Sequence, residues 1–228
     1  MTVLTAAAVT AFIGLGRWQW HRAAQARTLD ARFLAGSDAI HAAGAAAMAA
    51  LPRYAQVRVA GRYDDAHQFL LDNMSERDMP GYEVLTPLAL ADGRTLIVNR
   101  GWVPLSESRR RLPDVHLANP GMMVTVTGRL DNLPVPGISL GHAPPAPGPQ
   151  WPKLTSFPTM RDLSTALGRP LQARQLLLNP AEPAGYVRDW QPPGMSPLQH
   201  LSYAIQWWGF AALATGLYLF LNRRRAVA

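Results

Sequence analysis

The 228-residue chain contains no cysteine, a single lysine and few charged side chains overall. The lack of cysteine excludes disulfides, thiolate metal sites and covalent c-type haem attachment, so copper carriage through thiolates is also excluded. Charged residues make up 16% of the chain, against roughly 25% in ordinary soluble domains, while 48% of residues are hydrophobic. This deficit of charge indicates surface that is buried or that faces lipid.

The basic residues are almost all arginine and give the chain a net charge of +7. They are scattered along the sequence, with runs only at 109–111 and 223–225. A scattered basic surface is usually solvated or rests near anionic lipid. We therefore expect no nucleic-acid partner.

The sequence shows no arrangement typical of an active site. Its six histidines lack the spacing of a zinc site, and no HExxH, GxSxG or phosphate-binding glycine loop occurs. Asp64 and Asp65, or Glu76 and Asp78, are neighbouring acids near turns, where such residues are usually solvated caps and not an acid–base pair. We expect no enzyme activity, and a membrane-bound periplasmic enzyme ranks last among the alternatives.

The clearest structural feature is a charge-free run of 21 residues, 201–221. As a helix it would rise roughly 30 Å, which matches the hydrocarbon core of a bilayer. Its start is marked by Ser196 as N-cap, Pro197 at the first helical position and Gln199 as the second member of a capping box. These features predict a transmembrane helix over 196–221, followed by a cytoplasmic tail over 222–228.

The first 16 residues are also free of charge, but they are short for a span, which typically needs about 17–25 residues. Trp18 and Trp20 then resemble an interfacial aromatic belt. A signal peptide is the competing interpretation, but the segment has no basic n-region and no small-residue cleavage site follows it. We favour a retained first anchor over 1–16. Arginines follow both anchors, so the charge pattern alone leaves the orientation open.

Between the anchors we expect a helical connector over 17–51 and then a mainly β domain over 52–195. Pro52 stops an Ala-rich helix expected at 37–50, and Asp92-Gly93 predicts a tight hairpin because glycine accepts positive φ. Seven prolines make 133–152 a loop, since they cannot donate ladder hydrogen bonds. The periodicity predicts helices at 17–33 and at 159–167, closed by Gly168, and strands at 55–63, 68–73, 82–90, 95–103, 122–130 and 174–179.

The candidate site lies at the start of the second anchor. On a helix His200, Tyr203 and Trp207 share one face with Ala204 and Ala211, which sets an imidazole beside aromatic rings. Such a face suits ligation of haem iron by His200, with Trp207 and Tyr203 beside the macrocycle. Interfacial anchoring without any ligand is the alternative. Three small residues predict where the first anchor approaches this helix: Gly209, Ala212 and Gly216.

Four motifs resemble those of the surfeit locus protein 1 family of cytochrome c oxidase assembly factors. They occur in the family's order, with an anchor at each end, so that the resemblance covers nearly the whole chain. The short first anchor and the long proline-rich loop depart from the family's pattern. The motifs are residues 16–22 (GRWQWHR), 80–88 (PGYEVLTPL), 99–104 (NRGWVP) and 200–208 (HLSYAIQWW).

The resemblance implies an α+β protein of the bacterial inner membrane, with two transmembrane helices around a mainly β periplasmic domain and a cytoplasmic C-terminus. It implies binding of haem a and help with its insertion into oxidase subunit I, with His200 as the iron ligand and Trp207 at the same site. The expected partners are subunit I, a haem a synthesising enzyme and the lipid bilayer. The alternative is a scaffold that stabilises an oxidase assembly intermediate without holding haem. We interpret Arg100, Gly101 and Trp102 as structural or partner-facing.

Overall fold

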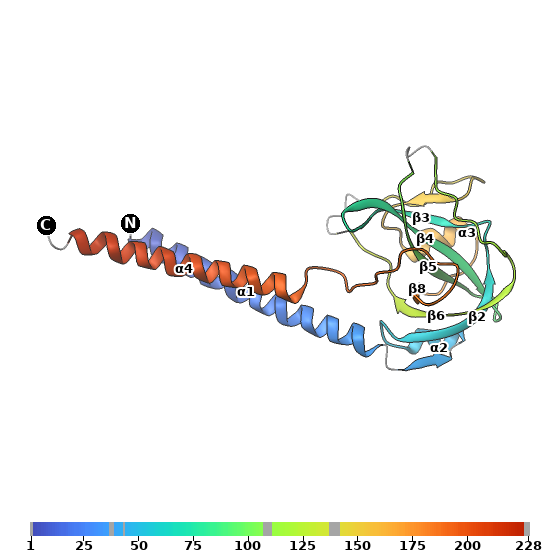
Figure 1. Ribbon diagram of the computed structural model, residues 1–228, viewed down its shortest axis with the longest axis horizontal. Coiled ribbons are helices and arrows are strands. Elements are labelled where there is room, and N and C mark those ends of the chain that lie inside the picture. Colours follow the sequence, from blue (N-terminus) through green and yellow to red (C-terminus); the bar gives the residue numbers. More distant parts are fainter. Residues whose placement is uncertain (1, 37–38, 43, 107–110, 137–141, 226–228) are drawn as a thin grey trace. The chain divides into compact units, whose positions relative to one another are not determined.

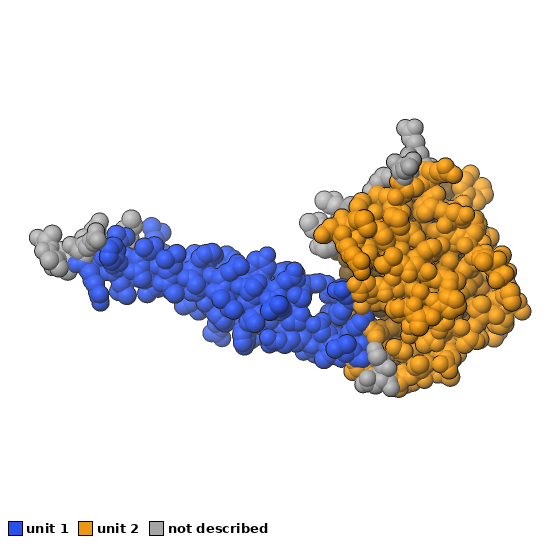
Figure 2. All heavy atoms as spheres, in the orientation of Figure 1, with its two compact units in different colours: residues 1–34, 191–228 blue, residues 35–190 orange. Residues whose placement is uncertain are grey.

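The computed structural model describes residues 2–225 except 37–38, 43, 107–110 and 137–141. The chain divides into two compact units, which Figure 2 distinguishes by colour. One unit is helical and combines Met1–Leu34 with Gln191–Ala228. The other unit, Ala35–Trp190, contains the sheet.

The sheet unit is built around a closed ring of five strands (Figure 1). Adjacent strands around the ring follow the order β2, β6, β8, β5, β4, and pairing of β4 with β2 closes the ring. The closing pair is antiparallel and sets Gly61 opposite Leu90. The five strands are β2 (Gln56–Tyr63), β4 (Met79–Leu90), β5 (Thr95–Pro104), β6 (Met123–Asp131) and β8 (Gln175–Leu178).

Strand β4 is long because one of its edges serves two neighbours. Its other edge pairs with β5 along the predicted hairpin, where Gly93 adopts φ 80°. The first half of the shared edge pairs with β3 (Phe69–Glu76), and the second half pairs with β2. Two short strands extend the sheet by parallel pairing: β1 (Ile40–Ala42) beside β2, and β7 (Lys153–Thr155) beside β3.

Apolar residues of all five ring strands pack into one cluster, against which Met48 also packs. In β2 every second residue is buried, because one face of the strand meets this cluster and the other meets solvent. In β5 all residues but the last are buried, since Val98 joins this cluster while Ile97 joins a second one. That second cluster includes Leu163 of α3 (Met160–Leu167).

The alternating patterns predicted the main strands to within a few residues of their bounds, and α3 is confirmed with its caps. Thr159 and Asp162 form a capping box, and Gly168 ends the helix with φ 67°. The helix expected at 37–50 was largely wrong. Of its described residues, only α2 (Ala45–Ala50) is helical and Ile40–Ala42 forms β1, while residues 37, 38 and 43 lie outside the described part. Gly44, the N-cap of α2, has no side chain that could cap a longer helix. The backbone of residues 40–42 makes its hydrogen bonds with β2 and so does not need a helix to satisfy them.

The helical unit consists of two antiparallel helices, α1 (Thr2–Ala35) and α4 (Pro197–Arg225). Contacts run from Thr2 with Tyr218 at one end to Gln19 with His200 at the other. The charge-free stretch expected over 1–16 forms the first part of α1, which continues to Ala35, so the helix expected at 17–33 is confirmed. The connector expected over 17–51 is helical in α1 and α2, but Ile40–Ala42 between them forms β1.

Among the described residues, Pro197–Arg223 is the one helix that is both long enough and apolar enough to cross a membrane. It starts at the predicted residue and continues past Leu221 into the expected tail. Helix α1 is longer, but its charge-free stretch ends at Gly16. Length and composition therefore support one of the two expected spans.

Candidate functional site

The first turn of α4 is fixed by the capping box that its sequence predicted. The backbone N–H of Gln199 donates to Ser196 Oγ at 3.2 Å, and the Ser196 N–H donates to Gln199 Oε1 at 2.9 Å. The His200 N–H then closes the turn on the carbonyl of Ser196 at 3.2 Å. The cap thus determines where on the helix surface the His200 side chain emerges.

His200 is buried against α1, with 7% of its surface exposed. Its Nδ1 lies 2.8 Å from Oε1 of Gln19 on α1. Within the part of the chain that the structure describes, Nε2 makes no hydrogen bond. One ring nitrogen is therefore engaged by α1, and the other has no protein partner among the described residues.

The other predicted site residues differ in their exposure along one face of α4. Trp207 is half-buried and stacks on Phe12 of α1, with ring centroids 5.7 Å apart and planes at 25°. Ala204 and Ala211 are buried beside it, as the shared-face prediction requires. Tyr203 is 43% exposed and does not join them. Trp207 lies two turns from His200, a rise of roughly 10 Å, so these two residues mark a stripe along the helix.

The close approach of the two helices occurs at a residue that the sequence analysis did not select. A Cβ on Gly16 would lie 2.2 Å from Nε1 of Trp208, so a larger residue would have to displace the indole. The indole of Trp20 lies 6.0 Å from the same ring. The expected contact through Gly209, Ala212 and Gly216 was wrong, because these three residues are exposed and a Cβ on either glycine would meet nothing within 4 Å.

The two motifs of the body face each other across the β4–β5 pair. Asn99 Nδ2 donates to Oε2 of Glu83 at 2.7 Å. Burial raises the pKa of the Glu83 carboxyl, and the hydrogen bond from Asn99 offsets this only in part. The Trp102 ring packs over Gly81, where a Cβ would lie 2.4 Å from Nε1. These contacts hold the hairpin together.

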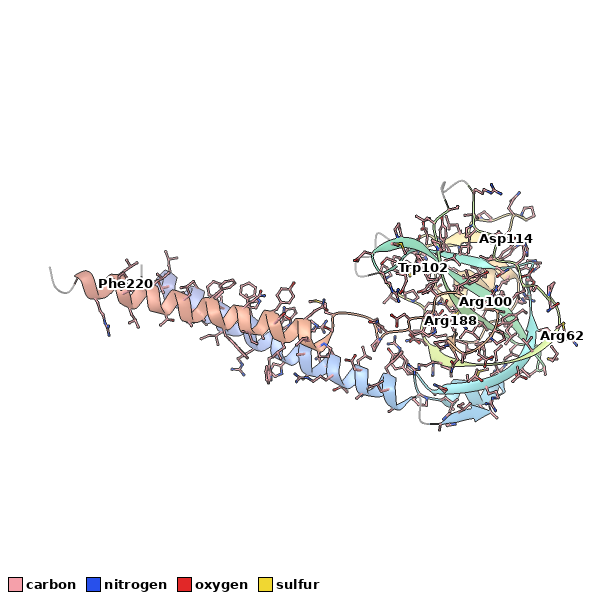
Figure 3. All side chains as sticks on the ribbon, in the orientation of Figure 1. Arg62, Arg100, Trp102, Asp114, Arg188 and Phe220 are labelled. Atoms are coloured by element: carbon pink, nitrogen blue, oxygen red, sulfur yellow. The ribbon has the colours of Figure 1, made fainter. Side chains whose placement is uncertain are left out.

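Arg100 belongs to the same structural framework, in the sheet unit where Figure 3 labels it. It is 3% exposed, and its Nε donates to the carbonyl of Ala184 at 2.7 Å. Its Nη1 donates to the carbonyl of Val115 at 2.9 Å and to Oε1 of Gln68 at 3.1 Å. Of the two roles expected for residues 100–102, the structure therefore supports the packing role over a partner-facing one, since Trp102 is also only 6% exposed.

The residues around His200 suit a metal that arrives with most of its own ligands. Within the described ranges, no group of three or more histidine, aspartate or glutamate side chains could hold a metal ion. A porphyrin supplies its own equatorial nitrogens and requires only an axial ligand from the protein. A single oriented imidazole is compatible with that requirement, and the half-buried Trp207 lies two turns further along α4.

Sequence reasoning selected His200 and Trp207 as candidates but missed the residues of α1 that contact them, Gln19 and Phe12. Gln19 lies in the motif at 16–22, which the resemblance had already singled out, whereas Phe12 precedes that motif. The four motifs join in two pairs, one pair between α1 and α4 and the other between β4 and β5. Motif membership was thus the available signal, and the pairing required the fold.

Comparison with known proteins identifies the family. A model of the SURF1 family matches residues 6–212, which include all four motifs. A SURF1-like protein of Monosiga brevicollis is 28% identical, over 92% of this chain and 83% of that relative. The family is membrane-associated. The chain belongs to the SURF1 family of cytochrome oxidase assembly factors.

Proposed function

We propose that the protein binds haem a through His200 and assists its insertion into subunit I of cytochrome c oxidase. The observation that carries this proposal is the imidazole in the first turn of α4, whose Nδ1 is engaged by Gln19 while Nε2 makes no hydrogen bond within the described chain. Histidine is a common axial ligand of haem iron, and the protein's contribution to such a cofactor is ligation, orientation and a dry surround. Trp207 supplies half-buried aromatic surface on this face of α4, and Tyr203 supplies more exposed aromatic surface.

The pairing of α1 with α4 supports two membrane spans. If α4 crosses the bilayer, the charge-free part of α1 lies in the same slab, because Thr2 contacts Tyr218 and Gly16 contacts Trp208. The shortness of this stretch is tolerable, since local thinning of the bilayer accommodates short spans at modest cost. Two spans then place both termini on one side. Because arginines follow both anchors, it is the resemblance to the family, together with the arginines at 223–225, that leads us to assign that side to the cytoplasm.

This topology assigns the sheet unit to the periplasm of a bacterial inner membrane. It also sets His200 at the periplasmic edge of the bilayer, level with the motif that contains Trp18 and Trp20. At that edge the proposed partners are a haem a synthesising enzyme, as the source of the cargo, and subunit I, as its recipient. In this proposal the protein itself catalyses no reaction.

A complementation experiment tests the proposal in cells that make haem a. A strain lacking the chromosomal copy would receive the wild type, His200→Ala or His21→Ala. His21 is a matched control because it is exposed on α1 near the same site. We expect His200→Ala to lower the haem a content of the oxidase, while His21→Ala leaves it unchanged.

The scaffold alternative predicts a different result for the same strains. If the protein stabilises an oxidase intermediate without holding haem, His200→Ala leaves the haem a content at the wild-type level. That outcome, with normal amounts of the variant in the membrane, would reject haem binding through His200.

A further inference from the structure

We infer that Gln19 is a positioning residue for His200, which fixes the tautomer of the imidazole and directs Nε2 toward a ligand. This inference rests on the proposed function, because an oriented Nε2 matters only if it ligates iron. It assigns a role to a side chain on α1, 181 positions away from the histidine that it contacts.

The chemistry of the contact determines the tautomer. The Gln19 atom that lies 2.8 Å from Nδ1 is the amide oxygen, which only accepts hydrogen bonds. With that oxygen as the acceptor, Nδ1 is the donor and carries the proton, and the lone pair remains on Nε2. In metal sites the ligating histidine usually donates its other N–H to such an acceptor, which fixes the orientation of the ring.

The surroundings make this contact persistent. His200 is 7% exposed and Gln19 is half-buried, so few water molecules compete for the proton on Nδ1. A hydrogen bond in such an environment is stronger than the same bond in water. The indoles of Trp20 and Trp208 approach each other next to it, and Gly16 allows Trp208 to lie close to α1. Helix packing thus places Gln19 in register with His200.

The test measures the tautomer of His200 in haem-free, full-length protein held in lipid nanodiscs. Ring ¹⁵N shifts distinguish protonated from unprotonated nitrogens, and His200→Ala identifies the signals among the six histidines. We expect His200 in the wild type to be the Nδ1–H tautomer. We expect Gln19→Leu to abolish this preference and Gln19→Glu, which keeps an acceptor oxygen, to retain it.

Gln25→Leu is the matched control, since Gln25 lies on the same helix and contacts Arg22 instead. It should leave the His200 signals unchanged. An Nε2–H tautomer in the wild type, or an unchanged His200 tautomer in Gln19→Leu, would overturn the inference.

Haem titration of the same proteins supplies the second measurement. We expect Gln19→Leu to weaken haem affinity by about 10- to 100-fold, as the loss of such supporting partners does in metal sites. We expect Gln19→Glu to bind haem with a higher iron–histidine stretching frequency, because a carboxylate makes the imidazole more basic. If the wild type shows the Nδ1–H tautomer but binds no haem, the proposed function fails while the orienting contact stands.

Discussion

Gly16 of α1 lies directly beneath the indole of Trp208 of α4, where a Cβ would come within 2.2 Å of Nε1. One residue at this point determines how closely the two helices pack. Since Gln19 follows one turn later on α1, the same point also determines whether Gln19 reaches His200.

Replacing Gly16 should therefore loosen the helix pair. We expect Gly16→Leu to lower the free energy of unfolding by about 1–3 kcal/mol, the usual cost of overpacking. Gly14→Leu is the control, because a Cβ there meets nothing within 4 Å. Denaturation of the full chain in detergent, followed by tryptophan fluorescence, would compare the two. Equal stability of the two variants would show that the Gly16 contact is not limiting.

Gly101 should be intolerant of alanine for a different reason. Its φ is +108°, and a Cβ would lie 2.5 Å from the carbonyl oxygen of Val187. Because that neighbour is backbone, it cannot move aside as a side chain can. We expect Gly101→Ala to cost more than the about 1–2 kcal/mol typical of left-handed backbone alone.

Gly121→Ala separates the two contributions to that cost. Gly121 also has positive φ, at 77°, but a Cβ there would meet nothing within 4 Å. Urea unfolding should therefore place Gly121→Ala between the wild type and Gly101→Ala. If the two alanine variants were equally stable, contact with Val187 would not explain the glycine.

The His116–Asp65 contact should make stability depend on pH. The hydrogen bond to Asp65, followed by the charge of that carboxylate, raises the pKa of His116 above 6.5. The folded state thus holds the proton more tightly than the unfolded state does. The stabilisation is complete below the unfolded pKa of about 6.5 and is lost as the pH rises through the folded pKa.

Melting temperatures of the wild type and His116→Ala check this sign. The difference in melting temperature between the two proteins should be larger at about pH 5.5 than at about pH 8.5. These two values lie on either side of the usual histidine pKa. His116→Gln, which cannot titrate, should show no such change against His116→Ala. A difference that grows toward alkaline pH would contradict the assignment.

The single lysine should anchor the proline-rich loop. Lys153 is 6% exposed, and its Nζ donates to the carbonyls of Ala146 at 2.7 Å and Gly148 at 2.8 Å while lying over Trp151. Lys153→Met should lower the free energy of unfolding by about 1.5–3 kcal/mol, since charged donors are lost. Lys153→Arg, which can still donate and stack, should lose less. Equal losses, measured by urea unfolding, would count against this role.

The sequence predicted those parts of the fold that depend on residues close together in the chain. The alternation in β2 follows from one buried face, and the start of α4 follows from Ser196, Pro197 and Gln199 acting within four consecutive positions. The hairpin followed from Asp92-Gly93 for the same reason. Each of these features depends on residues close together in the chain.

The remainder depends on contacts between distant residues. The ring closes because one edge of β4 pairs first with β3 and then with β2. A short stretch of sequence cannot predict this change of partner, because the strands involved are separate segments of the chain. The parallel pairing of β5 with β8 joins Val98 to Leu176, residues separated by about half of the sheet unit. At the candidate site, His200 was recognisable as an isolated imidazole beside aromatic residues, but Gln19 became its partner only through helix packing.

The most direct test of the central claim is the haem content of the purified full-length protein from cells that make haem a. The chain should carry haem a in a fixed ratio to protein, His21→Ala should keep it, and His200→Ala should lose most of it. The same haem content in His200→Ala and wild type, with both proteins folded, would contradict ligation by His200.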